Sequence, residues 1–307
     1  MRSVEAAGLR VSRLGIGTWQ FGSREWGYGE GYAREVAPAL LRRAVNLGIT
    51  FVDTAEVYGP GHSERIVGDT LRAMGAEAAD VVVATKFLPI LPVERIVAFQ
   101  AAGSRRRLGV DALDLYYAHW PNPLVSVRRV MQSLRPLVRD GFVRRVGVSN
   151  YSVGQWADAE QALGAPVVAN QVRFSLAHPA PAEDLVPYAA FHDRLVVAYS
   201  PLGQGLLAGR DAPAGRAVRA ISRDFRPGAE ERLASLRSAL AQIAATHRAT
   251  PAQVALAWVI HHPNTVAIPG ARTVEQLEEN AAASDIELSD DEFAALSAAA
   301  RQAAARA

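Results

Sequence analysis

Four residues could together deliver a proton to a carbonyl oxygen. Asp53, Lys86 and His119 each follow a short run of β-forming residues, and successive members are 33 residues apart. Tyr58 comes five residues after Asp53, in a loop rich in Gly and Pro. A nearby ammonium lowers the pKa of a tyrosine hydroxyl from its ordinary value of about 10. We therefore expect Lys86, held by Asp53, to make Tyr58 a proton donor near neutral pH, with His119 orienting the oxygen.

Lys86 is the only lysine among 33 basic residues. Arginine stays charged at any working pH, whereas the pKa of a buried lysine moves, so this exception favours a functional amine. No side chain supplies a hydride, so a reduction at this site requires a hydride cofactor. A lysine at the end of a strand could instead form a Schiff base. A lyase that uses Lys86 therefore stays open as an alternative.

The composition excludes several classes of protein. The chain has no cysteine, which rules out disulfides, thiolate catalysis and cysteine-based zinc sites, and no other metal-ligand pattern is present. A net charge of +2 without a long basic stretch gives little support to nucleic-acid binding. No apolar run approaches the roughly 20 residues of a membrane span, and the N-terminal residues do not resemble a signal peptide. We expect a soluble cytoplasmic protein without a metal, and favour a monomer over an oligomer.

Eight β-rich runs alternate with segments of helical period. This alternation favours a parallel sheet of the α/β class, and eight units favour closure into a (β/α)8 TIM barrel. The runs lie at 14–17, 51–52, 81–85, 113–118, 146–148, 167–170, 195–198 and 265–267. We expect a single domain over residues 1–307. An N-terminal β-hairpin at 4–11 would cap the barrel bottom, a long loop would span 202–229, and an extra helix near the C-terminus would span 233–247.

Eight segments resemble the aldo-keto reductase family, in the order in which the family has them. They are GIGTWQFG (15–22), FVDTAEVYGPGHSERIVG (51–68), VVVATK (81–86), LDLYYAHWPNP (113–123), RVGVSNY (145–151), NQVRFS (170–175), YSPLGQGLLAG (199–209) and IPGARTVEQLEEN (268–280). The resemblance implies reduction of an aldehyde or ketone by NADPH, with NADH also possible. It assigns the catalytic tetrad to the same four residues, Asp53, Tyr58, Lys86 and His119.

The resemblance also implies a cofactor site and a substrate pocket. The implied cofactor contacts are Gly17, Thr18, Trp19, Asp53, Ser149, Asn150, Gln171, Tyr199, Ser200, Pro201, Leu202, Gly203, Gly205, Leu207, Ile268, Gly270, Arg272, Gln276, Glu279 and Asn280. The implied pocket residues are Trp19, Tyr58, His119 and Trp120, with Trp26 as a further candidate. Gly270 and Gln276 stand where many members have Lys and Arg, which leaves Arg272 as the cation for the 2′-phosphate.

Two questions stay open at this stage. Some members of the family, such as potassium-channel β-subunits, hold NADPH mainly as a sensing module, and an intact tetrad is compatible with that role. The sequence also does not indicate which aldehyde or ketone is reduced. Asn122 stands where the family often has Asp, and from this difference alone we expect little consequence.

Overall fold

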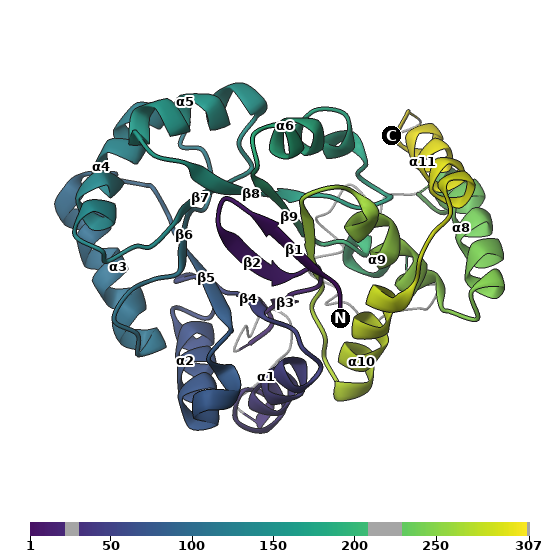
Figure 1. Cartoon of the computed structure of the whole chain (residues 1–307), viewed down its shortest axis with the longest axis horizontal. Coiled ribbons are helices and arrows are strands. Elements are labelled where there is room, and N and C mark those ends of the chain that lie inside the picture. The colour runs from purple at the N-terminus through teal and green to yellow at the C-terminus, as the bar shows by residue number, and fades with distance from the viewer. Residues whose placement is uncertain (22–30, 208–228, 306–307) are drawn as a thin grey trace.

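Eight parallel strands form the centre of the molecule and helices surround them (Figure 1). The structure is a computed structural model and describes residues 1–21, 31–207 and 229–305. The strands are β3 (Ile16–Gly17), β4 (Phe51–Asp53), β5 (Val82–Phe87), β6 (Leu115–Ala118), β7 (Val146–Ser149), β8 (Val167–Arg173), β9 (Leu195–Tyr199) and β10 (Thr265–Ile268). Leu14 bridges to Ala267 in parallel, and the Gly15 N–H donates to the Ala267 carbonyl at 2.8 Å. The expected (β/α)8 barrel is therefore confirmed.

Helices follow the strands and cover the outside of the barrel (Figure 1). They are α1 (Ala37–Asn46), α2 (His62–Met74), α3 (Glu94–Leu108), α4 (Val127–Arg139), α5 (Val153–Leu163), α6 (Leu185–Phe191), α8 (Ala229–Thr246), α9 (Pro251–His261), α10 (Val274–Ala282) and α11 (Asp290–Ala305). Ser152 and Thr250 each begin their helix with a capping box, in which side chain and backbone satisfy one another. The extra helices near the C-terminus are α8 and α11, which pack against each other.

A β-hairpin closes the N-terminal end of the barrel, as expected. Its strands β1 (Ser3–Ala6) and β2 (Leu9–Ser12) are antiparallel, and their apolar side chains join the cluster inside the barrel. The Arg145 guanidinium donates to the Gly8 carbonyl at 2.7 Å and so ties the hairpin turn to the barrel.

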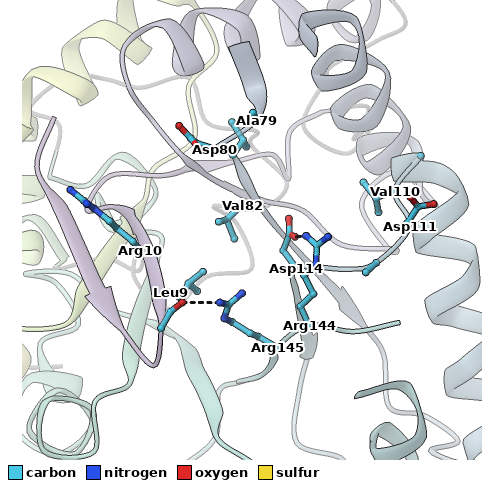
Figure 2. A pocket seen from close by; sticks show the side chains of 14 residues that line it. Leu9, Arg10, Ala79, Asp80, Val82, Val110, Asp111, Asp114, Arg144 and Arg145 are labelled. Carbon is cyan, nitrogen blue, oxygen red and sulfur yellow. Dashed lines mark hydrogen bonds and ion pairs between the residues drawn. The ribbon is translucent and has the colours of Figure 1, made fainter. Parts of the chain in front are cut away.

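Beside this hairpin lies an open pocket of about 560 Å³ (Figure 2). Its charged residues have mixed sign, and the ion pair between Arg144 and Asp114 belongs to its wall. It lies at the end of the strands opposite to Asp53 and Lys86, and that end of a barrel ordinarily serves stability.

Two helical glycines give a matched test of the packing. A Cβ on Gly68 of α2 would overlap the Leu108 carbonyl at the end of α3, whereas a Cβ on Gly154 of α5 would meet nothing within 4 Å. We expect Gly68→Ala to lower the free energy of unfolding by about 1–3 kcal/mol. Gly154→Ala should raise it by about 0.5–1 kcal/mol, because alanine has the higher helix propensity. Urea unfolding measures both, and equal effects would contradict the close approach of α2 and α3.

Candidate active site

The carboxyl ends of β4, β5 and β6 bring the four predicted residues together. Asp53 is the last residue of β4, Lys86 is the penultimate residue of β5 and His119 directly follows β6. Lys86 Nζ lies 2.5 Å from Asp53 Oδ1 and 3.2 Å from the Tyr58 hydroxyl. The Tyr58 and His119 rings have centroids 6.0 Å apart, in an edge-on arrangement. The spacing of the strand ends thus correctly predicted that Asp53, Lys86 and His119 lie at the same end of the barrel.

Lys86 and Asp53 form an ion pair that is almost closed to solvent. The lysine side chain is 0% exposed and the carboxylate 2%. Burial by itself lowers the pKa of Lys86, but the Asp53 carboxylate and the Tyr58 hydroxyl outweigh it and raise the pKa above the ordinary value. Burial raises the pKa of Asp53, and Lys86 and Gln171 partly offset that rise. Lys86 is accordingly an ammonium at neutral pH, and Nζ donates to Asp53, Tyr58 and the Thr54 carbonyl.

The Lys86 ammonium lowers the pKa of Tyr58 as expected, but the net pKa still lies above its ordinary value. Burial raises this pKa, and the Lys86 ammonium opposes the rise without cancelling it. The sequence indicated that the Lys86 ammonium lies near Tyr58, but it did not indicate that the Tyr58 hydroxyl loses its contact with water. Tyr58 therefore carries its proton at neutral pH, which is the state that a proton donor needs.

His119 is neutral for the same physical reason. Burial lowers its pKa to about 3, and the Lys86 ammonium contributes to that shift. A neutral imidazole can donate a hydrogen bond to a carbonyl oxygen without carrying a full charge. The electrostatics of the cluster thus separate into one buried ion pair, one protonated phenol and one neutral imidazole.

A chain of hydrogen bonds continues from Asp53 to the next strands. The side-chain amide of Gln171, on β8, donates to Asp53 Oδ2 at 2.6 Å. The Ser149 hydroxyl, on β7, donates to the backbone carbonyl of Gln171 at 2.9 Å. The Asn150 amide donates to Ser149 Oγ at 3.0 Å, and the Tyr199 hydroxyl donates to Asn150 Oδ1 at 3.1 Å. The structure therefore connects one predicted cofactor residue, Gln171, directly to the tetrad and three others, Ser149, Asn150 and Tyr199, through it.

Ser63 is a site residue that the sequence analysis missed. Its buried hydroxyl lies 2.7 Å from Thr18 Oγ1 and donates to the Thr18 carbonyl at 3.0 Å. Thr18 in turn donates from its backbone and its side chain to the Asp53 carbonyl, both at 2.9 Å. Ser63 thereby joins the start of α2 to the strand ends that carry Thr18 and Asp53. Its only signal in the sequence is its place within the segment that contains Asp53 and Tyr58.

The segment after β9 has an unusual backbone. Ser200, Gly203, Gln204 and Gly205 all have positive φ, at 50°, 58°, 57° and 97°. Such a backbone is costly for side chains other than glycine and often marks a functional turn. Of the other predicted residues in this segment, Pro201 and Leu207 are buried and Leu202 is half-buried.

Gly17 ends β3, and most of the other remaining predicted cofactor residues lie from the end of β10 into α10. A Cβ on Gly17 would lie 3.0 Å from the Ile268 carbonyl, and a Cβ on Gly270 would lie 3.0 Å from Gln20 Oε1, so both glycines pack closely against other parts of the chain. Thr273 caps α10, and Gln276 Oε1 accepts from the Arg272 N–H at 2.9 Å. Glu279 is half-buried, and the buried Asn280 amide donates to the Gly270 carbonyl.

Two tryptophans flank the tetrad at the open end of the barrel. Trp19 is 41% exposed and Trp120 is 49% exposed. Their ring centroids lie 6.3 Å from that of Tyr58 and 6.4 Å from that of His119, respectively. Trp26, and residues 208–228 of the expected loop, lie outside the described residues.

The described residues contain neither a membrane-spanning helix nor a group of three possible metal ligands. No helix among them is long and apolar enough to cross a membrane. No three His, Cys, Asp or Glu residues in residues 1–21, 31–207 and 229–305 are grouped so that they could hold a metal ion.

Comparison with known proteins gives the same family along almost the whole chain. The model of the aldo/keto reductase family matches residues 13–301. An uncharacterised oxidoreductase of Mycobacterium tuberculosis is 49% identical over 306 residues, which cover 98% of this chain and 93% of that protein. The methylglyoxal reductase YeaE of Escherichia coli is 32% identical over 289 residues, covering 94% and 90% of the two chains.

A solved structure agrees with the sequence relatives. The crystal structure of an aldo/keto reductase from Klebsiella pneumoniae, in complex with NADP and acetate, matches with a TM-score of 0.77 and 32% identity. The match covers 96% of this chain and 93% of that one. The barrel, the family model and these relatives agree, and the chain belongs to the aldo-keto reductase family of oxidoreductases.

Proposed function

We propose that the protein reduces the carbonyl group of an aldehyde or ketone with NADPH, and that Tyr58 donates the proton. The observation that carries this proposal is the buried Lys86 ammonium, which contacts both the Asp53 carboxylate at 2.5 Å and the Tyr58 hydroxyl at 3.2 Å. A phenol beside a fixed positive charge gives up its proton to an oxygen that gains negative charge, because the ammonium stabilises the phenolate left behind.

The residues around the tetrad fit a nicotinamide dinucleotide. Amides and hydroxyls at the ends of β7 and β8 suit a carboxamide, and the positive-φ turn after β9, which contains Gly203 and Gly205, suits a pyrophosphate. The residues that would hold the cofactor are Gly17, Thr18, Trp19, Asp53, Ser149, Asn150, Gln171, Tyr199, Ser200, Pro201, Leu202, Gly203, Gly205, Leu207, Ile268, Gly270, Arg272, Gln276, Glu279 and Asn280. Arg272 precedes the N-terminus of α10, and both favour a 2′-phosphate, so NADPH is preferred and NADH remains usable.

In this proposal the bound cofactor supplies the hydride to the carbonyl carbon. Tyr58 donates its proton to the carbonyl oxygen, so that the product is the alcohol and the phenolate then recovers a proton from water. Lys86 stabilises the phenolate, and Asp53 holds Lys86 in place. His119 donates a hydrogen bond that orients the same oxygen, while Trp19 and Trp120 flank the substrate.

The geometry argues against the Schiff-base alternative. An amine attacks a carbonyl with its lone pair, so a nucleophilic lysine must be deprotonated. Lys86 has a raised pKa, and its Nζ donates to Asp53, Thr54 and Tyr58. The ammonium therefore has no lone pair to offer, and this arrangement supports a positioning charge instead.

A panel of carbonyl substrates tests the proposed function. We expect the purified protein to consume NADPH in the presence of at least one aliphatic aldehyde, aryl aldehyde, ketone or dicarbonyl such as methylglyoxal, with a higher kcat/KM for NADPH than for NADH. Tight NADPH binding without consumption of any compound would contradict reduction and favour a sensing module. Labelling of Lys86 by borohydride in the presence of substrate would favour a lyase.

A further inference from the structure

Two loops beside the tetrad expose apolar side chains. The β5–α3 loop (residues 88–93) begins two residues after Lys86, and the β6–α4 loop (residues 119–126) begins at His119. Ile90 is 68% exposed and Leu91 is 62% exposed in the first loop, and Leu124 is 92% exposed in the second. Exposed apolar side chains commonly contact a ligand where they form a contiguous patch beside a site.

The Asn122 side chain joins these two loops. Its amide nitrogen donates to the Pro89 carbonyl at 2.6 Å and to the Ile90 carbonyl at 3.2 Å. Its amide oxygen accepts from the Leu124 N–H at 2.8 Å. Both ends of the amide are paired, which fixes its orientation and holds the backbone of Pro89 and Ile90 close to that of Leu124.

The other end of the β5–α3 loop is held separately. Glu56 Oε1 accepts from the Leu88 N–H at 2.8 Å and from the Gln100 amide at 2.9 Å. Gln100 also donates to the Leu88 carbonyl at 3.2 Å. Glu56 therefore fixes the loop where it leaves β5, and Asn122 fixes its middle, next to the exposed side chains.

An aspartate could not replace the Asn122 amide in this role. A carboxylate accepts hydrogen bonds but has no N–H, so it could keep the bond from Leu124 and would face the Pro89 and Ile90 carbonyls as a third acceptor. These repelling oxygens would separate the two loops. We expected little consequence from Asn at a position where the family often has Asp. The Asn122 amide nevertheless makes the hydrogen bonds that join the two loops.

We propose that Asn122 is a positioning residue for substrate specificity. It holds Ile90, Leu91 and Leu124 as an apolar rim beside the tetrad, and this rim binds the apolar part of a bulky aldehyde, such as an aryl ring. Asn122 does not touch the reacting atoms. The proposal rests on the proposed carbonyl reduction, because the rim adjoins the residues that would carry it out.

The test compares Asn122→Asp with wild type on two aldehydes, 4-nitrobenzaldehyde and propanal. We expect the KM for 4-nitrobenzaldehyde to rise about fivefold to tenfold, which corresponds to the loss of the neutral hydrogen bonds from Asn122 to Pro89 and Ile90. The kcat for this aldehyde should stay within about twofold. Both constants for propanal should also stay within about twofold, because propanal is too short to need the rim. Equal changes for the two aldehydes, or no change in either, would overturn the proposal.

Asn46→Asp is the matched control. Asn46 is exposed at the end of α1, and its side chain has no hydrogen bond in the described part of the chain, so the same change of charge there should leave both KM values unaltered. Asn122→Ala should resemble Asn122→Asp, but with a smaller effect, because it removes the donor without adding a repelling acceptor.

Hydrogen exchange provides a readout that does not depend on turnover. We expect the amides of residues 90, 91 and 93 to exchange faster in Asn122→Asp than in wild type, while those of α5 stay unchanged. Unchanged exchange in the β5–α3 loop would overturn the positioning role of Asn122 even if the protein reduced no aldehyde. If wild type lacks turnover but the exchange rates rise in Asn122→Asp, the proposed function is wrong while Asn122 still positions the loop.

Discussion

Tyr58→Phe is expected to lower kcat for carbonyl reduction by about 10²–10⁴-fold, the usual contribution of a positioned general acid. Phenylalanine keeps the ring that lies between Trp19 and His119 and removes only the hydroxyl that contacts Lys86 at 3.2 Å. The dissociation constant for NADPH should stay within about twofold, because Tyr58 is not among the residues assigned to the cofactor. Steady-state rates and fluorescence titration with NADPH measure the two quantities.

Tyr188→Phe provides the control for this change. Its hydroxyl, on α6, donates to Glu160 at 3.3 Å and lies outside the site. We expect a rate within about twofold of wild type, since the lost bond contributes only about 0.5–1.5 kcal/mol to stability. A Tyr58→Phe enzyme that retained a comparable rate would refute the role of Tyr58 as proton donor.

Lys86→Arg is expected to lose at least about 100-fold in kcat, although it preserves the positive charge. The Lys86 side chain is fully buried and its ammonium fits among three acceptors from Asp53, Thr54 and Tyr58. The larger, planar guanidinium cannot occupy this space without moving its neighbours, and overpacking of this kind costs about 1–3 kcal/mol of stability. Rates and thermal unfolding measure the two effects.

Lys86→Met separates charge from volume. Methionine is close to lysine in length, so it fills the space but leaves the Asp53 carboxylate buried without its partner. We expect the same loss of rate, together with a fall of about 3–5 kcal/mol in the free energy of unfolding. A near-normal rate in the Arg variant would show that any cation suffices at this position, and a near-normal rate in the Met variant would remove the ammonium from the mechanism altogether.

Much of the site could be predicted from the sequence because of how a parallel barrel is built. All eight strands point the same way, so residues that end successive strands lie at the same end of the barrel, whatever the conformation of the loops. Equal intervals of 33 residues were therefore enough to bring Asp53, Lys86 and His119 to the same end of the barrel. The single lysine marked the residue that now lies at the centre of the cluster.

The structure alone determined the charge states in that cluster. Burial raises the pKa of Tyr58 against the effect of Lys86, and it lowers the pKa of His119 to about 3. Burial results from segments that are far apart in the chain and close together in space, and no local pattern of residues reports it. The sequence consequently indicated which groups lie together, but not that the net pKa of Tyr58 lies above its ordinary value.

What the sequence determined was the barrel and the end of the barrel at which Asp53, Lys86 and His119 meet, because strand direction and spacing are local properties that repeat. What only the tertiary structure determined was contact across loops and access of water. Ser63 joins the start of α2 to Thr18, and Asn122 joins its own loop to the β5–α3 loop, in which the Pro89 and Ile90 carbonyls lie 33 and 32 residues away from it in the chain. Both contacts depend on where separate turns come together, and that follows from the packing of the whole barrel.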